Sequence, residues 1–300
     1  MKKIYGKLFF VFILIIGITC FQYKDELIDL KTNLSSKKED KQYVVEVKTK
    51  EKTMKLKLDD YLVGVVAGEM PASFELEALK AQVVASRTFV MSRNLKVDNT
   101  TNTQVYLTDS QMKKNWGKNY EKNKEKIEKA VKETHNEVMT YNGKYISALF
   151  FSSCNGKTVS NEDYFTGGEV AYLKSVDSSW DLKIDPTNKR TKTFTKQQIA
   201  NAFGVASPDI RITSYTKSGY VDKVIINHKE YSGREVREKL GLASSSFQIS
   251  LTSKGYTFTT RGHGHGVGMS QYGAEGMAQE GYDYKKILKH YYQNIKILSI

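Results

Sequence analysis

The feature that most constrains this 300-residue chain is an acidic residue between two helical patterns. Residues 58–67 combine early acidic residues with an apolar run, which predicts a short buried helix that ends at Gly68. Pro71 and Ser73 then predict the start of a second helix, with apolar residues at helical spacing. Glu69 is therefore expected at a corner between two buried helices, where its direction is fixed. The alternative is an ordinary solvated loop acid.

Three motifs occur in order along the chain. The first is Gly68-Glu69-Met70-Pro71, which continues into the helical stretch that ends at Thr88. The second lies within residues 232–247 and includes Ser232-Gly233-Arg234, and the third is the glycine-rich stretch 262–274. With these motifs, residues 44–297 resemble the stage II sporulation protein D family, whose broader group includes amidase-enhancer proteins of bacterial cell walls. Three ordered motifs over this length are far more specific than one short pattern.

The resemblance implies a lytic transglycosylase that cleaves peptide-stripped glycan strands of peptidoglycan during engulfment in sporulation. Glu69 matches the family's catalytic acid/base. One glutamate first protonates the glycosidic oxygen and then accepts the proton of the C6 hydroxyl, so that a 1,6-anhydromuramic acid end forms. Ordinary glycosidases instead use two carboxylates. To donate a proton at neutral pH, Glu69 needs a pKa raised by burial or by the negative end of the preceding helix.

An alternative of another class also follows from the resemblance. The chain could be a wall-binding protein without catalytic activity that activates a cell-wall amidase. A pure activator has no chemical need for the Gly-Glu-Met-Pro corner, which therefore favours the enzyme. The implied partners are peptidoglycan glycan strands, a sporulation cell-wall amidase and a membrane protein, and no cofactor is expected.

Six residues of the matched motifs are expected to bind substrate: Arg87, His263, His265, Ser270, Gln271 and Tyr272. Arg87 lies roughly four to five helical turns beyond Glu69, so it contacts substrate only if the helix follows the cleft. The alternative for Arg87 is an ion pair within the fold.

The stretch 261–268 alternates glycine with other residues, and its glycines permit backbone shapes and close approaches that other residues do not. Its histidines, His263 and His265, leave three hypotheses open: a wall of the substrate cleft, a structural turn or a metal site. No third ligand lies nearby in the sequence, so tetrahedral metal binding would need residues from elsewhere. We expect a substrate cleft without a metal ion.

The charge balance is strongly basic. Lys and Arg outnumber Asp and Glu by 46 to 33, for a net charge of +13. This excess suits an anionic partner such as lipid headgroups or an acidic cell-wall polymer, although a Lys-rich surface also serves solubility. No Arg-rich block or nucleic-acid-binding motif accompanies it, so nucleic acid is not an expected partner. The aromatic-rich stretch 163–185 is suited either to stacking on sugars or to packing beneath a loop.

The first 23 residues predict a membrane anchor. Lys2, Lys3 and Lys7 precede an uncharged run from Leu8 to Tyr23. Counted back to Ile4, with Lys7 reaching toward the membrane surface, the run approaches the ~20 residues that a membrane span requires. A cleaved signal peptide is the alternative. We expect a single-pass protein of the cell membrane with residues 24–42 as linker and the catalytic domain, 43–300, on the outer side.

The outer domain is predicted to be α+β, with mixed helices, mostly antiparallel strands and a substrate cleft. Residues 43–58 and 138–151 predict hairpins, the second around an Asn-Gly turn. Residues 186–250 are a candidate lobe or insertion beside the catalytic core. Cys154 is expected at a strand end or cleft edge, with Cys20 in the membrane segment, so an intramolecular disulfide is not expected.

Overall fold

The computed structural model describes residues 42–49, 51–100 and 103–300, and its compact domain begins at Val44. The predicted anchor and nearly all of the predicted linker lie outside the described residues. Within the described part of the chain, no helix combines the length and the apolar character needed to cross a membrane.

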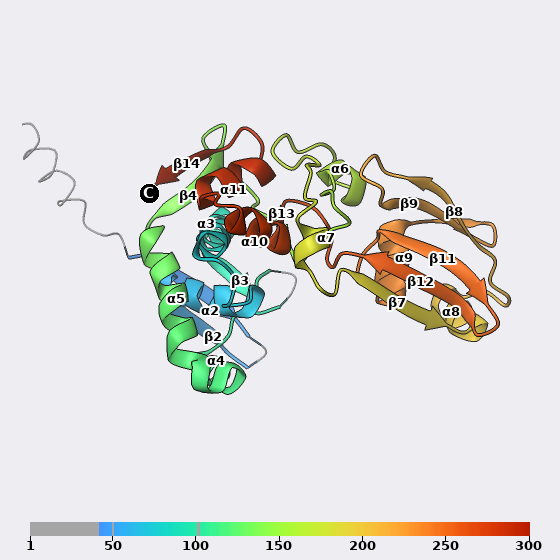
Figure 1. Ribbon diagram of the computed structural model, residues 1–300, viewed down its shortest axis with the longest axis horizontal. Coiled ribbons are helices and arrows are strands. Elements are labelled where there is room, and N and C mark those ends of the chain that lie inside the picture. Colours follow the sequence, from blue (N-terminus) through green and yellow to red (C-terminus); the bar gives the residue numbers. More distant parts are fainter. Residues whose placement is uncertain (1–41, 50, 101–102) are drawn as a thin grey trace, which may run out of the picture. The chain divides into compact units, whose positions relative to one another are not determined.

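The centre of the helical part is α3, which spans Leu76–Ser92 and is buried along most of its length (Figure 1). Four helices pack against it: α2 (Leu58–Glu69), α5 (Tyr120–Glu133), α10 (Gln271–Gln279) and α11 (Tyr284–Tyr291). Ala78, Ala81 and Ala85 form a small-residue stripe on α3, and all are fully buried, so neighbouring helices can approach closely. Helix α4 (Asp109–Trp116) and a 3-10 turn (Gly117–Asn119) lead into α5.

Two small sheets border these helices. In the first, β1 (Val44–Lys48) pairs antiparallel with β2 (Thr53–Lys57) and parallel with β3 (Lys96–Asp98). In the second, β4 (Glu137–Tyr141) lies between β5 (Lys144–Tyr145) and β14 (Lys296–Ser299). Asn142 and Gly143 connect β4 to β5 with φ of +49° and +76°, which confirms the predicted type I′ turn.

The helix boundaries around Glu69 differ from the prediction. Helix α2 continues through Glu69, with Met70 as its extended C-cap, so Gly68 does not end it. Helix α3 begins at Leu76, five residues after Pro71, because residues 71–75 form a turn before the helix. The Glu75 N–H at its start donates to Glu275 Oε2 at 2.6 Å. Helix α5 ends at Glu133, and Val138 lies in β4, the first strand of the hairpin predicted from residue 138.

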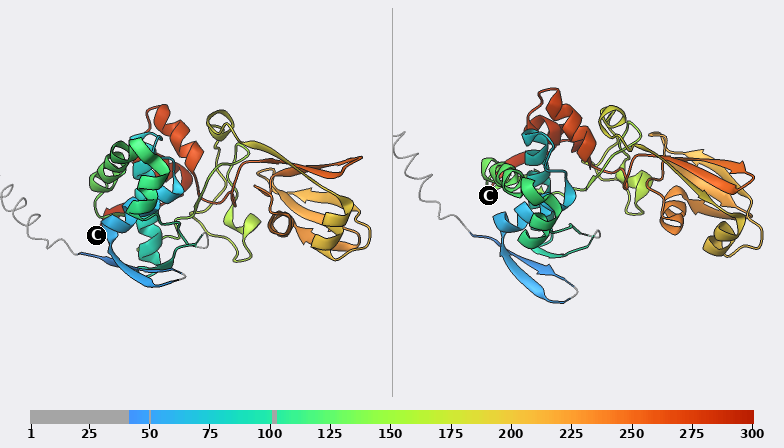
Figure 2. Two further views of the ribbon diagram at one scale, coloured as in Figure 1. Left: turned by 90° about the horizontal axis from the view of Figure 1, so that it is seen from below. Right: turned by 60° about the horizontal axis from the view of Figure 1, so that its bottom comes forward.

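Residues 189–261 form a unit of strands and helices that we call the β-lobe (Figure 2). One sheet has the order β10-β9-β8 and the other β11-β12-β7, and both are antiparallel. The elements are β7 (Lys189–Phe194), α8 (Lys196–Phe203), β8 (Ile210–Tyr215), β9 (Val221–Ile226), β10 (Lys229–Ser232), α9 (Gly233–Leu240), β11 (Phe247–Thr252) and β12 (Gly255–Arg261).

The β-lobe has its own hydrophobic cluster, which runs from Ile199 to Phe258 along the chain. Its two helices begin directly after Thr195 and Ser232, each of which caps the helix N-terminus within a complete capping box. Most strand pairs among the described residues are antiparallel, which confirms an α+β fold.

Residues 149–188 connect the helical part to the β-lobe. They contain β6 (Phe150–Phe151), α6 (Asn161–Tyr164) and α7 (Asp181–Ile184). The short strand β13 (Met269–Ser270) pairs parallel with β6, so the C-terminal part of the chain returns to this connection.

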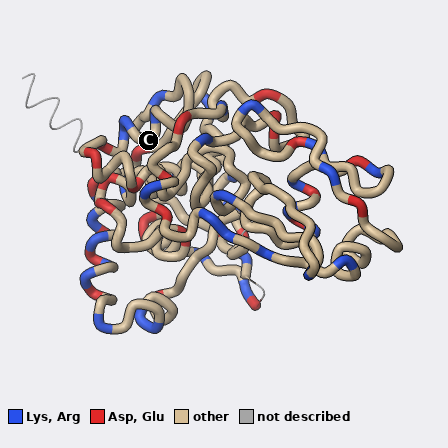
Figure 3. Tube along the Cα trace, turned by 45° about the vertical axis from the view of Figure 1, so that its right-hand side comes forward, with Lys and Arg blue, Asp and Glu red and all other residues tan. Residues whose placement is uncertain are grey.

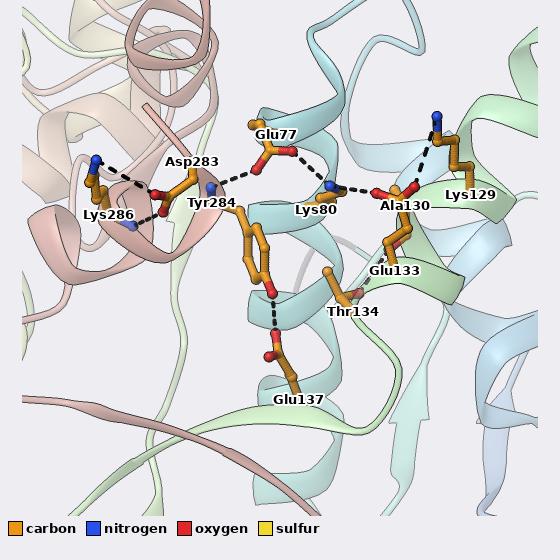
Figure 4. A network of polar contacts seen from close by, with 10 residues as sticks. All are labelled: Glu77, Lys80, Lys129, Ala130, Glu133, Thr134, Glu137, Asp283, Tyr284 and Lys286. Carbon is orange, nitrogen blue, oxygen red and sulfur yellow. Dashed lines mark hydrogen bonds and ion pairs between the residues drawn. The ribbon is translucent and has the colours of Figure 1, made fainter. Parts of the chain in front are cut away.

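Charged side chains join the helices at the surface. Charges of both signs follow one another along α5 (Figure 3). Lys80 on α3 contacts Glu77 at 2.7 Å and Glu133 at 2.5 Å, while Glu77 also accepts the Tyr284 N–H at 2.9 Å (Figure 4). This network connects α3, α5 and α11. Glu77 therefore links the first turn of α3 to α11 as well as to Lys80.

Candidate active site

Glu69 is the last residue of α2 and is only partly exposed. Its Oε1 accepts the backbone N–H of Val105 at 2.6 Å, and Oε2 has no hydrogen-bond partner among the described residues. Burial raises the pKa of Glu69 above its ordinary value, and the Val105 N–H offsets part of this by favouring the charged form. The carboxyl group is thus held at Oε1 and open at Oε2, and its raised pKa favours the protonated form.

Two glycines of α2 allow the chain around Val105 to approach. A Cβ on Gly64 would lie 2.2 Å from the Tyr106 ring, and one on Gly68 would lie 2.7 Å from the Val105 carbonyl oxygen. Gly68 therefore serves close approach rather than helix termination.

Sequence reasoning did not anticipate the contact between α2 and the chain around Val105. Tyr61 on α2 donates to Gln104 Oε1 at 2.9 Å, and its ring stacks on Tyr106 at 5.9 Å. The available signal was the pair of glycines four residues apart, Gly64 and Gly68, which leaves one face of α2 bare.

Glu69 opens into a pocket of about 930 Å³, which we call the main pocket. Of the residues expected to bind substrate, His263, His265, Gln271 and Tyr272 line it together with Glu69. The structure thus brings residues that are about 200 positions apart in the sequence into one cavity.

The glycine-rich loop, residues 262–268, needs its glycines for two reasons at once. Gly262, Gly264, Gly266 and Gly268 have φ of +80°, +114°, +84° and +84°, values that residues with a Cβ rarely adopt. A Cβ on Gly262 would also lie 2.6 Å from the Ser153 carbonyl oxygen, and one on Gly268 would lie 2.1 Å from that of Leu149. The loop consequently packs backbone against backbone along residues 149–154.

The two histidines of this loop have different surroundings. Nδ1 of His265 accepts the Val267 N–H at 3.1 Å, and its ring lies among Phe151, Tyr164 and Phe165 at centroid distances of 5.7, 6.0 and 5.7 Å. Burial lowers the pKa of His265 to about 4, so the ring is neutral at neutral pH. His263 keeps an exposed side chain while its backbone pairs with Ser153 in both directions.

Arg87 is placed inside the fold and not in the main pocket. It is fully buried, and its Nη1 donates to the carbonyl oxygens of Thr134 at 2.7 Å and Glu137 at 3.1 Å. Nη2 lies 3.8 Å from Asp59 Oδ1, and burial lowers the pKa of Arg87 to about 10. This arrangement corresponds to the alternative of an ion pair within the fold, since the guanidinium is fully buried and does not line the main pocket.

Ser270 is also buried and takes part in a second internal network. Its Oγ donates to Asp181 Oδ1 at 2.5 Å, and Asp181 accepts further bonds from Ser178 Oγ at 2.5 Å and the Cys154 N–H at 2.8 Å. Burial raises the pKa of Asp181 to about 6. Cys154 is fully buried and burial raises the pKa of its thiol, so it is a core residue and not an exposed nucleophile.

The opposite wall of the main pocket comes from α6 and α9. Arg234 lies over the rings of Tyr164 and Phe165 at 5.4 and 5.3 Å, and Arg237 Nη1 donates to the Tyr164 hydroxyl at 2.9 Å. Tyr164 and Phe165 belong to the aromatic-rich stretch for which sugar stacking was one interpretation, whereas the two arginines were not predicted to line a site. The signal was present, because Arg234 and Arg237 belong to the second motif and lie three residues apart on one helix face.

Within the described residues, no group of three His, Cys, Asp or Glu side chains is placed to hold a metal ion. Nδ1 of His265 is already occupied, because it accepts the Val267 N–H.

Comparison with known proteins places this geometry in a family. The family described as Stage II sporulation protein matches residues 46–141. Stage II sporulation protein D of Bacillus subtilis (strain 168) is 44% identical over 255 residues, which cover 80% of this chain and 74% of that protein. The chain belongs to the stage II sporulation protein D family.

Two further relatives show the range of the similarity. Stage II sporulation protein D of Bacillus amyloliquefaciens is also 44% identical over 255 residues, with 80% of this chain and 74% of that protein covered. A Bacillus subtilis (strain 168) protein named Amidase enhancer is 29% identical over 296 residues, covering 79% of this chain and 40% of that protein. In this member of the stage II sporulation protein D family, the matched region 46–141 contains Glu69, Val105 and Arg87.

Proposed function

We propose that the protein is a peptidoglycan lytic transglycosylase that acts in sporulation and cleaves peptide-stripped glycan strands to 1,6-anhydromuramic acid ends. The observation that carries this proposal is a single available carboxyl group in the main pocket. The two acids that line the pocket are Glu69 and Glu238, and Glu238 is paired with Arg234 at 2.8 Å. The relatives named Stage II sporulation protein D support the link to sporulation.

The proposed reaction uses Glu69 twice. Its protonated Oε2 gives a proton to the glycosidic oxygen as the bond between that oxygen and the anomeric carbon breaks. The carboxylate then takes the proton from the C6 hydroxyl of the same muramic acid ring, whose oxygen forms the new bond to the anomeric carbon. No water is consumed, and Glu69 ends in its initial protonation state.

The surroundings of Glu69 suit both half-reactions. Burial raises its pKa and so favours the protonated acid that the first step requires. The Val105 N–H at 2.6 Å stabilises the carboxylate that exists between the two steps. A hydrolase that relied on two carboxylates would need a second unpaired acid across the pocket.

The cellular setting is part of the proposal. We infer that residues 1–23 anchor the protein in the cell membrane, with the catalytic domain on the outer side, and that a sporulation cell-wall amidase and a membrane protein are its partners. The amidase would supply the peptide-stripped strands. Recovery of the mature protein from sporulating cells should yield a membrane-bound chain that retains its N-terminal peptide, and a mature N-terminus near Cys20 or Tyr23 would contradict the anchor.

A second candidate function is supported by the relative named Amidase enhancer, 29% identical to this chain. In that case the main pocket would bind glycan without cleaving it, and the partner amidase would do the chemistry.

Mass spectrometry of products from purified, peptide-stripped glycan separates these functions. The domain of residues 43–300 should release anhydro ends. Reducing ends would indicate a hydrolase, and intact glycan together with faster amidase turnover would indicate an activator.

Glu69→Gln provides the residue-level test. We expect the variant to fold and to bind glycan, with cleavage reduced at or beyond the upper end of the roughly 10²–10⁴-fold range of acid–base assistance. Glu75→Gln is the matched control, because Glu75 is exposed and precedes α3. Glu77 is a poorer control, since it bonds Lys80 and Tyr284. Unimpaired cleavage by Glu69→Gln would refute the catalytic assignment.

A further inference from the structure

A second groove adjoins the main pocket. It has a volume of about 330 Å³ and is lined by β7 residues Arg190 and Lys192 and by residues 241–243 after α9. His263 lines both this second groove and the main pocket. The two cavities therefore meet at His263, beside the main pocket that holds Glu69.

Two arginines flank His263 at this junction, and both are held by neutral oxygens. Arg190 donates from Nη2 to Thr187 Oγ1 at 2.7 Å and from Nη1 to the Gly262 carbonyl oxygen at 3.3 Å. Arg237 donates from Nη1 to the Tyr164 hydroxyl at 2.9 Å and from Nε to the Ala243 carbonyl oxygen at 3.3 Å. Each guanidinium is thus oriented while part of its donor capacity stays unused.

The positive charge at the junction is not neutralised by an ion pair. In the described part of the chain, neither Arg190 nor Arg237 lies within salt-bridge distance of a carboxylate. The carboxylate that acts on His263 is that of Asp185. Asp185 is buried and accepts hydrogen bonds from Ser153 Oγ and from the Thr187 N–H and hydroxyl. Partial burial lowers the pKa of His263, and the positive charges of Arg190 and Arg237 lower it further, with Asp185 opposing them. The contribution of the two arginines is the one that favours an anion, because partial burial disfavours any charge.

We propose that Arg190, Arg237 and His263 form a subsite for a carboxylate carried by the glycan, one step along the strand from the bond that Glu69 cleaves. The inference rests on the proposed function and specifies how that site selects its substrate. A guanidinium fork matches a carboxylate in geometry and charge, and a neutral imidazole adds one N–H donor. A free lactyl carboxylate on muramic acid satisfies this subsite, whereas an amide-linked peptide presents no charge there.

Binding can be tested without cleavage in the full domain with Glu69→Gln. The probes are a peptide-free muramic acid glycan oligosaccharide, the same oligosaccharide with its carboxylates amidated, and an N-acetylglucosamine oligosaccharide of equal length. Calorimetry should show roughly 10- to 100-fold tighter binding of the free carboxylate form, the range expected for a hydrogen-bonded charge. Equal affinity for all three probes, or no binding, would overturn the proposal. Because these comparisons change the ligand, they do not depend on how a variant folds.

Substitutions identify the residues that cause the preference for the free carboxylate. Arg190→Gln should remove the preference for the free carboxylate and leave the affinity for the amidated probe unchanged, and Arg190→Lys should restore part of the preference. Arg211→Gln, on β8 of the same β-lobe, removes the same charge outside both cavities and should change nothing. If Arg190→Gln weakens binding of both probes equally, Arg190 only supports the loop and the subsite is refuted.

Failure of the proposed function is a separate result. It would appear as the absence of anhydro ends from the parent protein, whichever probes bind to the Glu69→Gln domain.

Discussion

The substitution Gly68→Ala tests how Glu69 is held. In an ordinary helix, replacing glycine by alanine stabilises a protein by about 1 kcal/mol, so the naive expectation is a gain. Here the added Cβ would lie 2.7 Å from the Val105 carbonyl oxygen and 3.1 Å from Val105 Cγ1. Backbone cannot yield as a flexible side chain does, so the segment around Val105 has to move away from α2.

The size of the expected loss in the free energy of unfolding follows from the hydrogen bond that this movement breaks. The Val105 N–H donates to Glu69 Oε1 at 2.6 Å, and a hydrogen bond to a charged group contributes about 1.5–3 kcal/mol. Subtracting the gain in helix propensity leaves a net loss of about 0.5–2 kcal/mol in the free energy of unfolding. Cleavage should also fall, because the carboxyl group loses its fixed orientation and the stabilisation of its charged form.

Urea denaturation at neutral pH and anhydro-end release measure the two effects. Gly167→Ala is the control, since a Cβ at Gly167 meets nothing within 4 Å, and it should leave stability and cleavage close to those of the parent. If Gly68→Ala is more stable than the parent and cleaves at the parent rate, the Val105 contact does not position Glu69.

Titration and chelation provide three more tests. Because the pKa of Glu69 is raised, the native state keeps the Glu69 proton to higher pH than the unfolded state does. In denaturant titrations Glu69→Gln should therefore be more stable than the parent at pH 7, and this difference should disappear below pH 4.5, the ordinary pKa of the carboxyl group. His265 behaves oppositely: its pKa falls from 6.5 to about 4, so parent stability should drop as pH decreases through that window, and His265→Gln should flatten the dependence. Cleavage should survive dialysis against a chelator, whereas stoichiometric zinc with chelator-sensitive cleavage would contradict a metal-free site.

Features set by neighbouring residues were predictable from the sequence. The hairpin of β1 with β2 and the Asn142-Gly143 turn were expected and are present. The caps at Thr195 and Ser232 depend on equally local patterns. Each depends on chemistry within a few positions, such as tolerance of positive φ or a hydroxyl that accepts a helix N–H. Such terms act in the same way wherever the segment is placed in the fold.

Features set by distant residues were not predictable in this way. Arg87 is enclosed because the carbonyl groups of Thr134 and Glu137 converge on it, 47 and 50 positions along the chain. Ser270 lies in the third motif beside Gln271, yet it contacts the buried Asp181 while Gln271 lines the main pocket. Nothing in the local pattern distinguishes a motif residue that supports the site from one that lines it.

The start of α3 shows a third limit. Pro71 and Ser73 are good helix-start residues, but the helix begins at Leu76 because Glu275, 200 positions later, accepts the Glu75 N–H. A tertiary partner thus replaced the local cap that the sequence offered.

The packing of loop 262–268 along residues 149–154 determines at what stage of folding the main pocket forms. The main pocket needs Glu69 from the early part of the chain and Gln271 and Tyr272 from its last thirty residues. Strand β14, which pairs with β4, comes later still. Contacts between residues so far apart in the sequence form late, because the entropy of closing the long loop is lost before the contacts can stabilise the chain. A chain that is still being synthesised therefore has no complete main pocket until Gln271 and Tyr272 have been made. Helices α10 and α11, which pack on α3, also come from this last part of the chain.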